Sequence, residues 1–137
     1  MAGVLHNITS RRTFTFTNTA LSNSIEIPLV RALDTLDAKA LELLVRVHSV
    51  SIGTGASIDI KAYPISLTSE EPDTDFIKST AVATVTLSPS TTAPSLSLAA
   101  LSTPYGHMVR ISITGTQASS SQTITATLSI DLLAHDN

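Results

Sequence analysis

The sequence contains no cysteine and no tryptophan, and only 4% of its residues are aromatic. Without cysteine, disulfide bonds and thiolate metal sites are excluded. With so few aromatic rings, the core has to be built mainly from Val, Ile, Leu and Ala, within a hydrophobic fraction of 42%. A chain of 137 residues is long enough to bury such a core as a single domain.

Charged residues are also scarce. They make up 14% of the chain, compared with roughly 25% in typical soluble domains. Serine and threonine take their place, so the polar surface is mostly neutral hydroxyl, which protects poorly against association. The formal net charge is −3, and the only adjacent basic residues are Arg11 and Arg12. Because nucleic-acid binding needs clustered Lys and Arg, we expect no nucleic-acid partner.

Long apolar stretches are absent as well. No segment approaches the roughly 20 apolar residues that span a bilayer. Residues 1–12 lack the basic region and the apolar region of a signal peptide. We therefore expect no membrane partner, and a protein that is made and kept in the cytoplasm or released by lysis.

Hydrophobic residues recur with period two in short runs, the pattern of half-buried strands. Residues 13–17 alternate cleanly, with Phe14 and Phe16 on one face. Further runs lie at 25–29, 41–52, 58–64, 81–88, 96–100, 108–116 and 123–132. The pattern predicts an all-β fold, a single antiparallel β-sandwich of about eight strands and jelly-roll type. The sandwich is expected over residues 13–134, after an extended N-terminal arm at residues 1–12.

Local features refine this prediction. Pro28 favours an edge position for its strand, where a missing N–H costs little. The longest run changes phase near His48 and Ser49, which predicts a β-bulge or a bend. Gly53 and Gly55 predict a tight hairpin between the third and fourth strands.

Two segments leave alternatives open. A set of apolar residues has helical spacing: Leu33, Leu36, Ala40, Leu43, Leu44 and Val47. With Asp34 as a possible cap, a turn or two of helix over residues 34–41 competes with strand there. Residues 68–80 form the longest polar loop, which carries four acidic residues: Glu70, Glu71, Asp73 and Asp75. These carboxylates could bind calcium, but the loop lacks the glycine turn and spacing of a calcium loop, so a solvated loop is favoured.

No residue constellation points to catalysis. None of the four histidines has the spacing of a metal pair. His48 and His107 are expected to be hydrogen-bonded structural residues, and His6 and His135 to lie in tails. The chain has no Gly-x-Ser-x-Gly elbow, no phosphate-binding glycine loop, and no carboxyl pair suited to glycoside cleavage. The sequence predicts no enzyme activity, no catalytic residue, no cofactor and no metal.

The runs 43–50, 83–87 and 123–128 resemble those of small β-sandwich structural proteins of tailed bacteriophages. The Ser/Thr-Pro linkers, the N-terminal arm and the absence of cysteine and of an export signal are similar too. The resemblance extends along nearly the whole chain and is strongest to head decoration (cement) and minor capsid proteins. It implies a virion protein, made in the bacterial cytoplasm, that binds the major capsid protein and stabilises the expanded head. It also implies a homo-oligomer, with a trimer favoured.

The candidate partner-binding residues lie in the N-terminal arm: Val4, Leu5, Ile8, Arg11 and Arg12. An arm with these apolar side chains could add a strand to a neighbouring virion protein or anchor to it. A disordered terminus is the alternative.

Two other functions stay open. A carbohydrate-binding module is possible because many are β-sandwiches, although sugar binding usually needs exposed aromatic rings and few are available here. A tail or baseplate connector protein would share the fold and differ only in its partner.

Overall fold

The computed structural model describes the backbone at residues 4–17, 22–26, 30–31, 40–67, 72–77, 80–102, 108–119 and 121–135, and the side chains at 5–17, 40–63, 80–102, 109–119 and 121–135. Over these residues the chain is all-β, with ten strands. In this part of the chain no helix is long and apolar enough to cross a bilayer. The strands are β1 (Val4–Phe16), β2 (Ser22–Glu26), β3 (Val30–Arg31), β4 (Ala40–Ser51), β5 (Ser57–Leu67), β6 (Pro72–Ile77), β7 (Ala83–Leu87), β8 (Ser95–Ala100), β9 (Met108–Thr116) and β10 (Ile124–His135).

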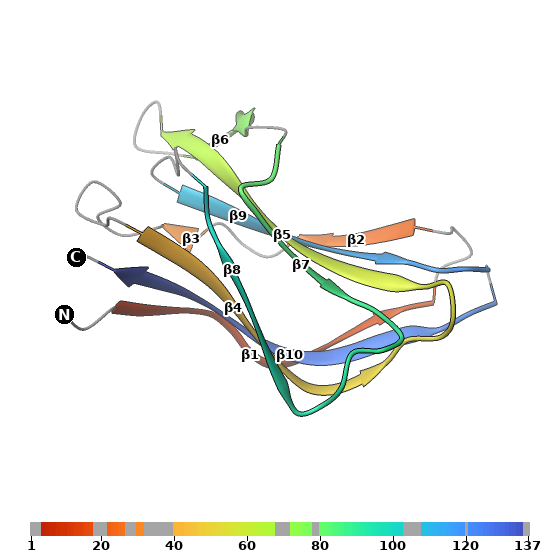
Figure 1. The fold of residues 1–137 in the computed structure, drawn as a ribbon. Coiled ribbons are helices and arrows are strands. Elements are labelled where there is room, and N and C mark those ends of the chain that lie inside the picture. The colour runs from red at the N-terminus through yellow and green to blue at the C-terminus, as the bar shows by residue number, and fades with distance from the viewer. Residues whose placement is uncertain are drawn as a thin grey trace.

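The strands form two antiparallel sheets that lie face to face (Figure 1). Sheet A has the order β1-β10-β4-β8, and sheet B has the order β2-β9-β5-β6. In sheet B, β3 pairs with β9 beyond the end of β2, and β7 pairs with β5 on the side that β6 also occupies. Sheet A thus has four strands, and the six strands of sheet B fill four positions across its width.

The strand pairing is nested along the chain. The first strand, β1, pairs with the last, β10, and the next pairs inward are β2 with β9, β4 with β8 and β5 with β7. The contacts β10–β4 and β9–β5 join these ribbons into the two sheets. As a result Val4 lies opposite Ala134, and β1 begins beside the end of β10 (Figure 1).

The turn between β4 and β5 crosses from sheet A to sheet B. Ala56 N donates to Gly53 O at 3.1 Å, and Gly55 has a φ of 81°, which glycine adopts without steric cost. The predicted tight turn is therefore confirmed. The predicted hairpin is wrong, because β4 pairs with β10 and β8 whereas β5 pairs with β9, β7 and β6.

The core lies between the sheets and is built from the inward residue of each alternating pair. Phe14 and Phe16 are buried, as predicted. In the central strands of both sheets the inward positions are almost all aliphatic and almost fully buried: Leu43, Val45, Val47, Ile58, Ile60, Ile111, Ile113, Leu128, Ile130 and Leu132. Burying one such side chain contributes roughly 1.5–3 kcal/mol, so this aliphatic layer dominates the stability of the fold.

The predicted bulge in the third expected strand is confirmed. In the β4–β10 ladder Leu128 lies opposite Val47, and Thr127 lies opposite Ser49. His48 is therefore the extra residue, and it changes which residues of β4 face the core.

The N-terminal segment differs from the prediction. Residues 4–12 form the first part of β1 and pair with β10 instead of extending as a free arm. The register of this ladder shifts twice, between Asn7 and Thr9 and between Thr9 and Arg12. Each extra residue turns the following side chains to the other face, which removes the period-two signal of a strand.

The expected acidic loop also contains a strand. Residues 72–77 form β6, which pairs with the end of β5. Its Pro and Asp residues have low β-propensity, which explains why the sequence did not predict it. The side chains that would decide the calcium alternative lie outside the described residues.

Two further predictions, the edge strand near Pro28 and the possible helix over 34–41, fall partly outside the described residues. The run predicted at 25–29 shares Ile25 and Glu26 with β2, which lies at the edge of sheet B, and Pro28 itself is outside the described residues. Of the possible helix over 34–41, Ala40 and Leu41 belong to β4, and the other residues are outside the described part of the chain.

Candidate interaction surface

The outer face of sheet A carries the most exposed large hydrophobic side chains of the described residues. Leu96 and Leu98 of β8 are 56% and 57% exposed, and Leu5 of β1 is 56% exposed. The strands β8 and β1 are the two opposite edges of this sheet. The period-two alternation of 96–100 was predicted, but its leucines face the solvent while Ser95 and its alternates face inward.

Half-buried leucines connect the two edges across the outer face. Leu44 of β4 lies opposite Leu98, and Leu133 of β10 lies opposite Leu5. Each of the four strands therefore contributes leucine to this face. Exposed leucines gathered on one sheet face are typical of a surface that contacts another protein.

A polar cluster, the outer polar network, is set into the same face and centres on Asp131 of β10. Asp131 is only 2% exposed. Its Oδ1 accepts a hydrogen bond from Asn7 Nδ2 at 2.8 Å, and its Oδ2 accepts one from Arg46 Nη2 at 3.2 Å. Asn7 and Arg46 belong to the strands on either side of β10, so the carboxylate ties three strands together.

Ser129, two residues earlier on β10, completes the network and is also 2% exposed. Its Oγ accepts a hydrogen bond from Arg11 N at 3.0 Å and lies 2.7 Å from His48 Nε2. Arg11 lies at a register shift of β1, and His48 is the extra residue of the β4 bulge. One serine thus fixes an irregular position in each neighbouring strand, and His48 has the structural role that the sequence predicted.

The other histidine predictions have mixed outcomes. His6 and His135 do not lie in tails, because both belong to paired strands of sheet A. His135 Nε2 is 3.5 Å from Glu42 Oε1. His107 is outside the described residues. In the described part of the chain no group of three or more His, Asp or Glu side chains is arranged to hold a metal ion.

The candidate residues of the N-terminal segment lie along one edge of sheet A. Leu5, Arg11 and Arg12 are exposed, and Ile8 packs against the core. The guanidinium of Arg12 lies 4.9 Å from the centre of the Phe14 ring. For Val4 only the backbone is described. Sequence reasoning found these residues but missed Ser129, Asp131, Leu96 and Leu98, since alternation alone does not say which face is outer.

Arg11 is held in a left-handed conformation with a φ of 46°. This region costs a non-glycine residue about 1–2 kcal/mol, and the hydrogen bond that Arg11 donates comes from its backbone. Arg11→Gly is therefore expected to raise the free energy of unfolding by about 1 kcal/mol, measured by urea denaturation. Arg12→Gly is the control. It should lower stability by a similar amount because it removes the contact with Phe14 and relieves no strain.

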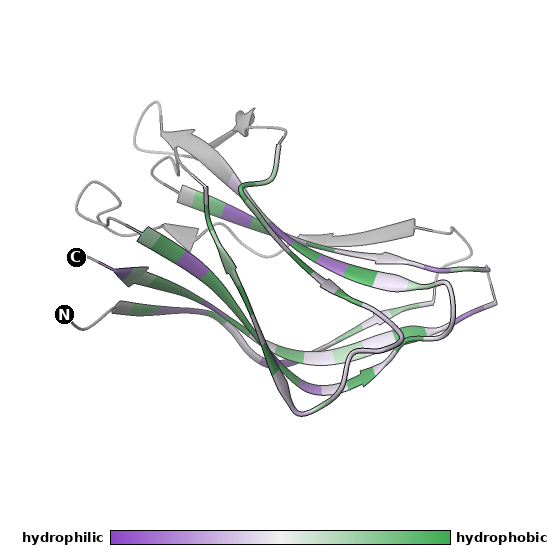
Figure 2. Cartoon of the chain, viewed as in Figure 1, coloured by the Kyte–Doolittle hydropathy of each residue, from purple (hydrophilic) through white to green (hydrophobic). Residues whose placement is uncertain are grey.

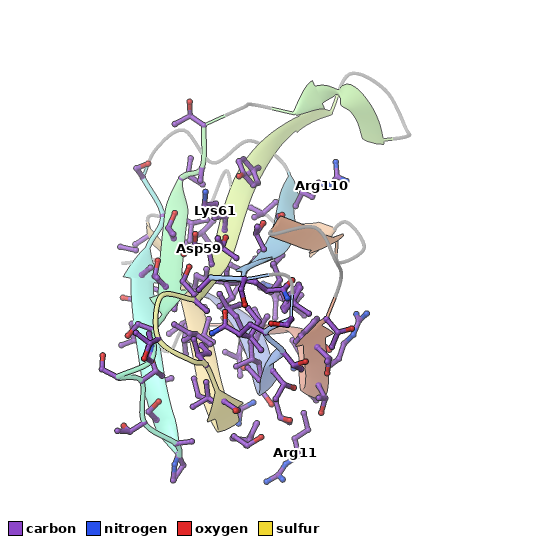
Figure 3. The ribbon with its side chains drawn as sticks, turned by 90° about the vertical axis from the view of Figure 1, so that its right-hand side faces the viewer. Arg11, Asp59, Lys61 and Arg110 are labelled. Atoms are coloured by element: carbon purple, nitrogen blue, oxygen red, sulfur yellow. The ribbon has the colours of Figure 1, made fainter. Side chains whose placement is uncertain are left out.

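The outer face of sheet B has a different character. It is lined by threonines and charged groups, and Thr86 Oγ1 donates to Asp59 Oδ1 at 2.7 Å. Lys61 and Tyr63 continue along β5, and Arg110 lies opposite Tyr63 on β9. Figure 3 shows Asp59, Lys61 and Arg110 on the sheet B side, well away from Arg11. The two outer faces therefore offer different surfaces, leucine-rich on sheet A and hydroxyl-rich and charged on sheet B.

Comparison of the chain with known protein families, with curated proteins and with solved structures gave no significant match.

Proposed function

We propose that the chain is a non-enzymatic structural protein of a virion, a capsid decoration protein that binds the major capsid lattice and stabilises the head. The nested strand pairing carries the proposal. A jelly roll of about eight strands is a double sheet, and it is an architecture of viral capsid domains. Two facing sheets, each four strands wide, with the first strand paired to the last and successive strands paired inward, support assigning this connectivity to the chain. In this assignment β2 with β3, and β6 with β7, each share one strand position.

The outer polar network suits such a role because it makes the outer face of sheet A rigid. Asp131 and Ser129 hold β1 and β4 to β10 through side-chain bonds in addition to the backbone ladder. A surface fixed before binding loses little conformational freedom when it binds. Short hydroxyl side chains, which dominate the polar surface, add little side-chain entropy cost.

We assign the contact with the capsid lattice to the β1 edge of sheet A. Leu5 offers an apolar anchor, and Arg11 and Arg12 offer exposed cations a few residues further along the same strand. Val4 continues this edge toward the N-terminus, and Ile8 holds the strand against the core. This protein would be made in the bacterial cytoplasm and reside in the virion as a homo-oligomer.

Binding to capsids tests the proposal. The purified chain is expected to sediment with expanded, undecorated heads of the phage that encodes it and to stay in solution with unexpanded procapsids. Leu5→Lys is expected to weaken head binding by tenfold or more, since burial of a charge replaces an apolar anchor that is central to the contact. The matched control Thr84→Lys, at an exposed position of β7, should bind as the wild type does.

Other outcomes would contradict this proposal or favour a different function. A chain that binds neither form of head contradicts the decoration role. A stable ring of six or twelve copies would favour a tail or connector protein. Retention on a glycan array would favour a carbohydrate-binding module, for which Tyr63, half-buried beside Lys61 and Asp59 on the outer face of sheet B, is the described aromatic residue in a suitable place.

A further inference from the structure

The backbone of β8 is open on one side. β8 is the last strand of sheet A, and within the described residues no strand pairs with it on the side away from β4. Leu101 N donates to Leu41 O at 2.9 Å, which makes this residue pair a hydrogen-bonded one. Hydrogen-bonded and non-hydrogen-bonded pairs alternate along an antiparallel ladder. The residues whose N–H and C=O groups point to the open side are therefore Leu96, Leu98 and Ala100.

The side chains of these residues share a face. Residues 96, 98 and 100 are exposed on the outer face of sheet A, and the intervening residues face inward. An incoming strand would therefore find a row of backbone donors and acceptors beside two leucines that are more than half exposed. Both parts of a β-strand addition site, the backbone ladder and the side-chain contacts, lie on the same three residues.

β8 has none of the features that protect an edge strand from pairing with another chain. Natural proteins protect edge strands with charged residues, proline or bulges. β8 contains only Ser, Leu and Ala, and its register with β4 runs without a shift over all paired residues. The opposite edge of the same sheet is protected. β1 has two register shifts, and its exposed Arg11 has a positive φ. Over the described residues, the sheet thus presents one protected edge and one open edge.

The strand at this edge is itself uncharged, and the charged residues beside it in sheet A are Glu42 and Arg46 of β4, opposite Ala100 and Leu96. Residues 79–109 include no Asp, Glu, Lys or Arg, and this segment contains both β7 and β8. Just past the end of β8, Ser102 N points to the side away from β4 and donates to Val82 O at 2.9 Å, so the segment before β7 closes this end of the edge and the open part is at Leu96 and Leu98. In Figure 2 the strongly hydrophilic bands fall on strands such as β4 and β5, whereas β7 and β8 are pale or green. Pairing of two β8 strands therefore places no like charges directly opposite each other, which is the arrangement that destabilises a strand pair.

We propose that two copies of the chain associate through their β8 strands, paired antiparallel about a two-fold axis. Such pairing places Leu96 of one copy opposite Leu98 of the other, with all four leucines on one continuous outer face. Sheet A then continues across both copies and ends on each side at the protected β1. Because the contact uses the open edge of both copies, it closes at two chains and does not grow into a filament.

The mass of the isolated chain in solution tests this contact. Light scattering on a sizing column over a concentration series is expected to show the wild type rising toward twice its 14.4 kDa chain mass. Leu98→Lys is expected to stay at the chain mass over the same range, with at least a tenfold loss of dimer affinity. Leu5→Lys changes an equally exposed leucine on the opposite edge of the sheet and should dimerise as the wild type does.

Amide hydrogen exchange provides a second readout that does not depend on a substitution. The N–H groups of Leu96, Leu98 and Ala100 should exchange more slowly at high than at low protein concentration, and those of Leu5 and Arg12 should not change. A wild type that is monomeric at every concentration overturns the proposal, as does a dimer that Leu98→Lys leaves intact. A trimer insensitive to Leu98→Lys also overturns the β8 contact but is compatible with the decoration role, so the two proposals fail separately.

Discussion

Gly115→Ala is expected to destabilise the protein by about 3 kcal/mol, although alanine is the better residue for a strand. Gly115 is buried in β9, and it is not among the residues with positive φ. Backbone entropy alone would therefore favour alanine by roughly 0.5–1 kcal/mol. A Cβ at this position, however, would overlap the ring of Phe16, with Cγ and Cδ2 in contact and Cδ1 at 2.7 Å. Phe16 has no exposed surface, so its ring cannot move into solvent, and overpacking costs more than the entropy gains.

Gly53→Ala is the matched control for this prediction. A Cβ at Gly53 would meet the end of the Gln122 side chain, which is only partly buried and can move aside. Its expected cost is below about 1 kcal/mol. Urea denaturation of both variants provides the comparison. Phe16→Leu should rescue part of the Gly115→Ala loss, so that the double variant is less destabilised than the two single effects predict together. Equal stability of the two glycine variants would contradict the assigned contact between β9 and β1.

The sequence predicted most of the strands whose ladder is regular, although the run at 25–29 overlaps β2 only at Ile25 and Glu26. Residues 13–17 alternate without interruption and form the second half of β1, whereas the first half was predicted to be a free arm. The difference lies in the shifts on either side of Thr9, which break the alternation in the sequence while the backbone pairing with β10 continues. A single bulge inside a long apolar run, at His48, stayed recognisable because regular alternation flanks it on both sides.

Alternation defines which residues share a face but not which face is the inner one. In β10 the apolar set is long and faces the core, as expected. In β8 the leucines are outside, and the small residues are inside, at the margin of the core. The local sequence pattern also does not predict which strands pair with each other. The Gly53–Gly55 turn has the residues of a hairpin, but its flanking strands pair with segments far away in the chain. The candidate surface depends on both properties, so only its β1 residues were predicted.

The burial of the outer polar network could not be predicted from the sequence either. The alternation of the sequence separates Ser129 and Asp131 from the core residues of β10. It did not indicate that both would be 2% exposed, because their burial comes from neighbours on β1 and β4. A buried carboxylate on an outer sheet face needs its partners, and its cost when a partner is removed can be measured.

Arg46→Met is expected to lower the free energy of unfolding by about 2–3 kcal/mol, and by more than Arg46→Ala does. The Arg46 side chain is 50% exposed, and its Nη2 lies 3.2 Å from Oδ2 of the buried Asp131. Methionine would keep the carboxylate covered but remove its cation, so that among the described residues Asn7 is the remaining side-chain donor. Alanine would open the site, and water would hydrate the carboxylate in place of the arginine.

Combining Arg46→Met with Asp131→Leu is expected to recover most of this loss, because apolar replacement of a buried ion pair is often neutral or stabilising. Asn7 is exposed, so its amide can bond to water when the carboxylate is gone. Urea denaturation of the wild type, the two single variants and the double variant should give a coupling energy of about 2 kcal/mol. Whether Arg46→Ala or Arg46→Met costs more stability shows which property of Arg46 matters. If alanine costs more than methionine, Arg46 acts through the packing of its aliphatic stem, and the ion pair with Asp131 is not what holds β4 to β10 on this face.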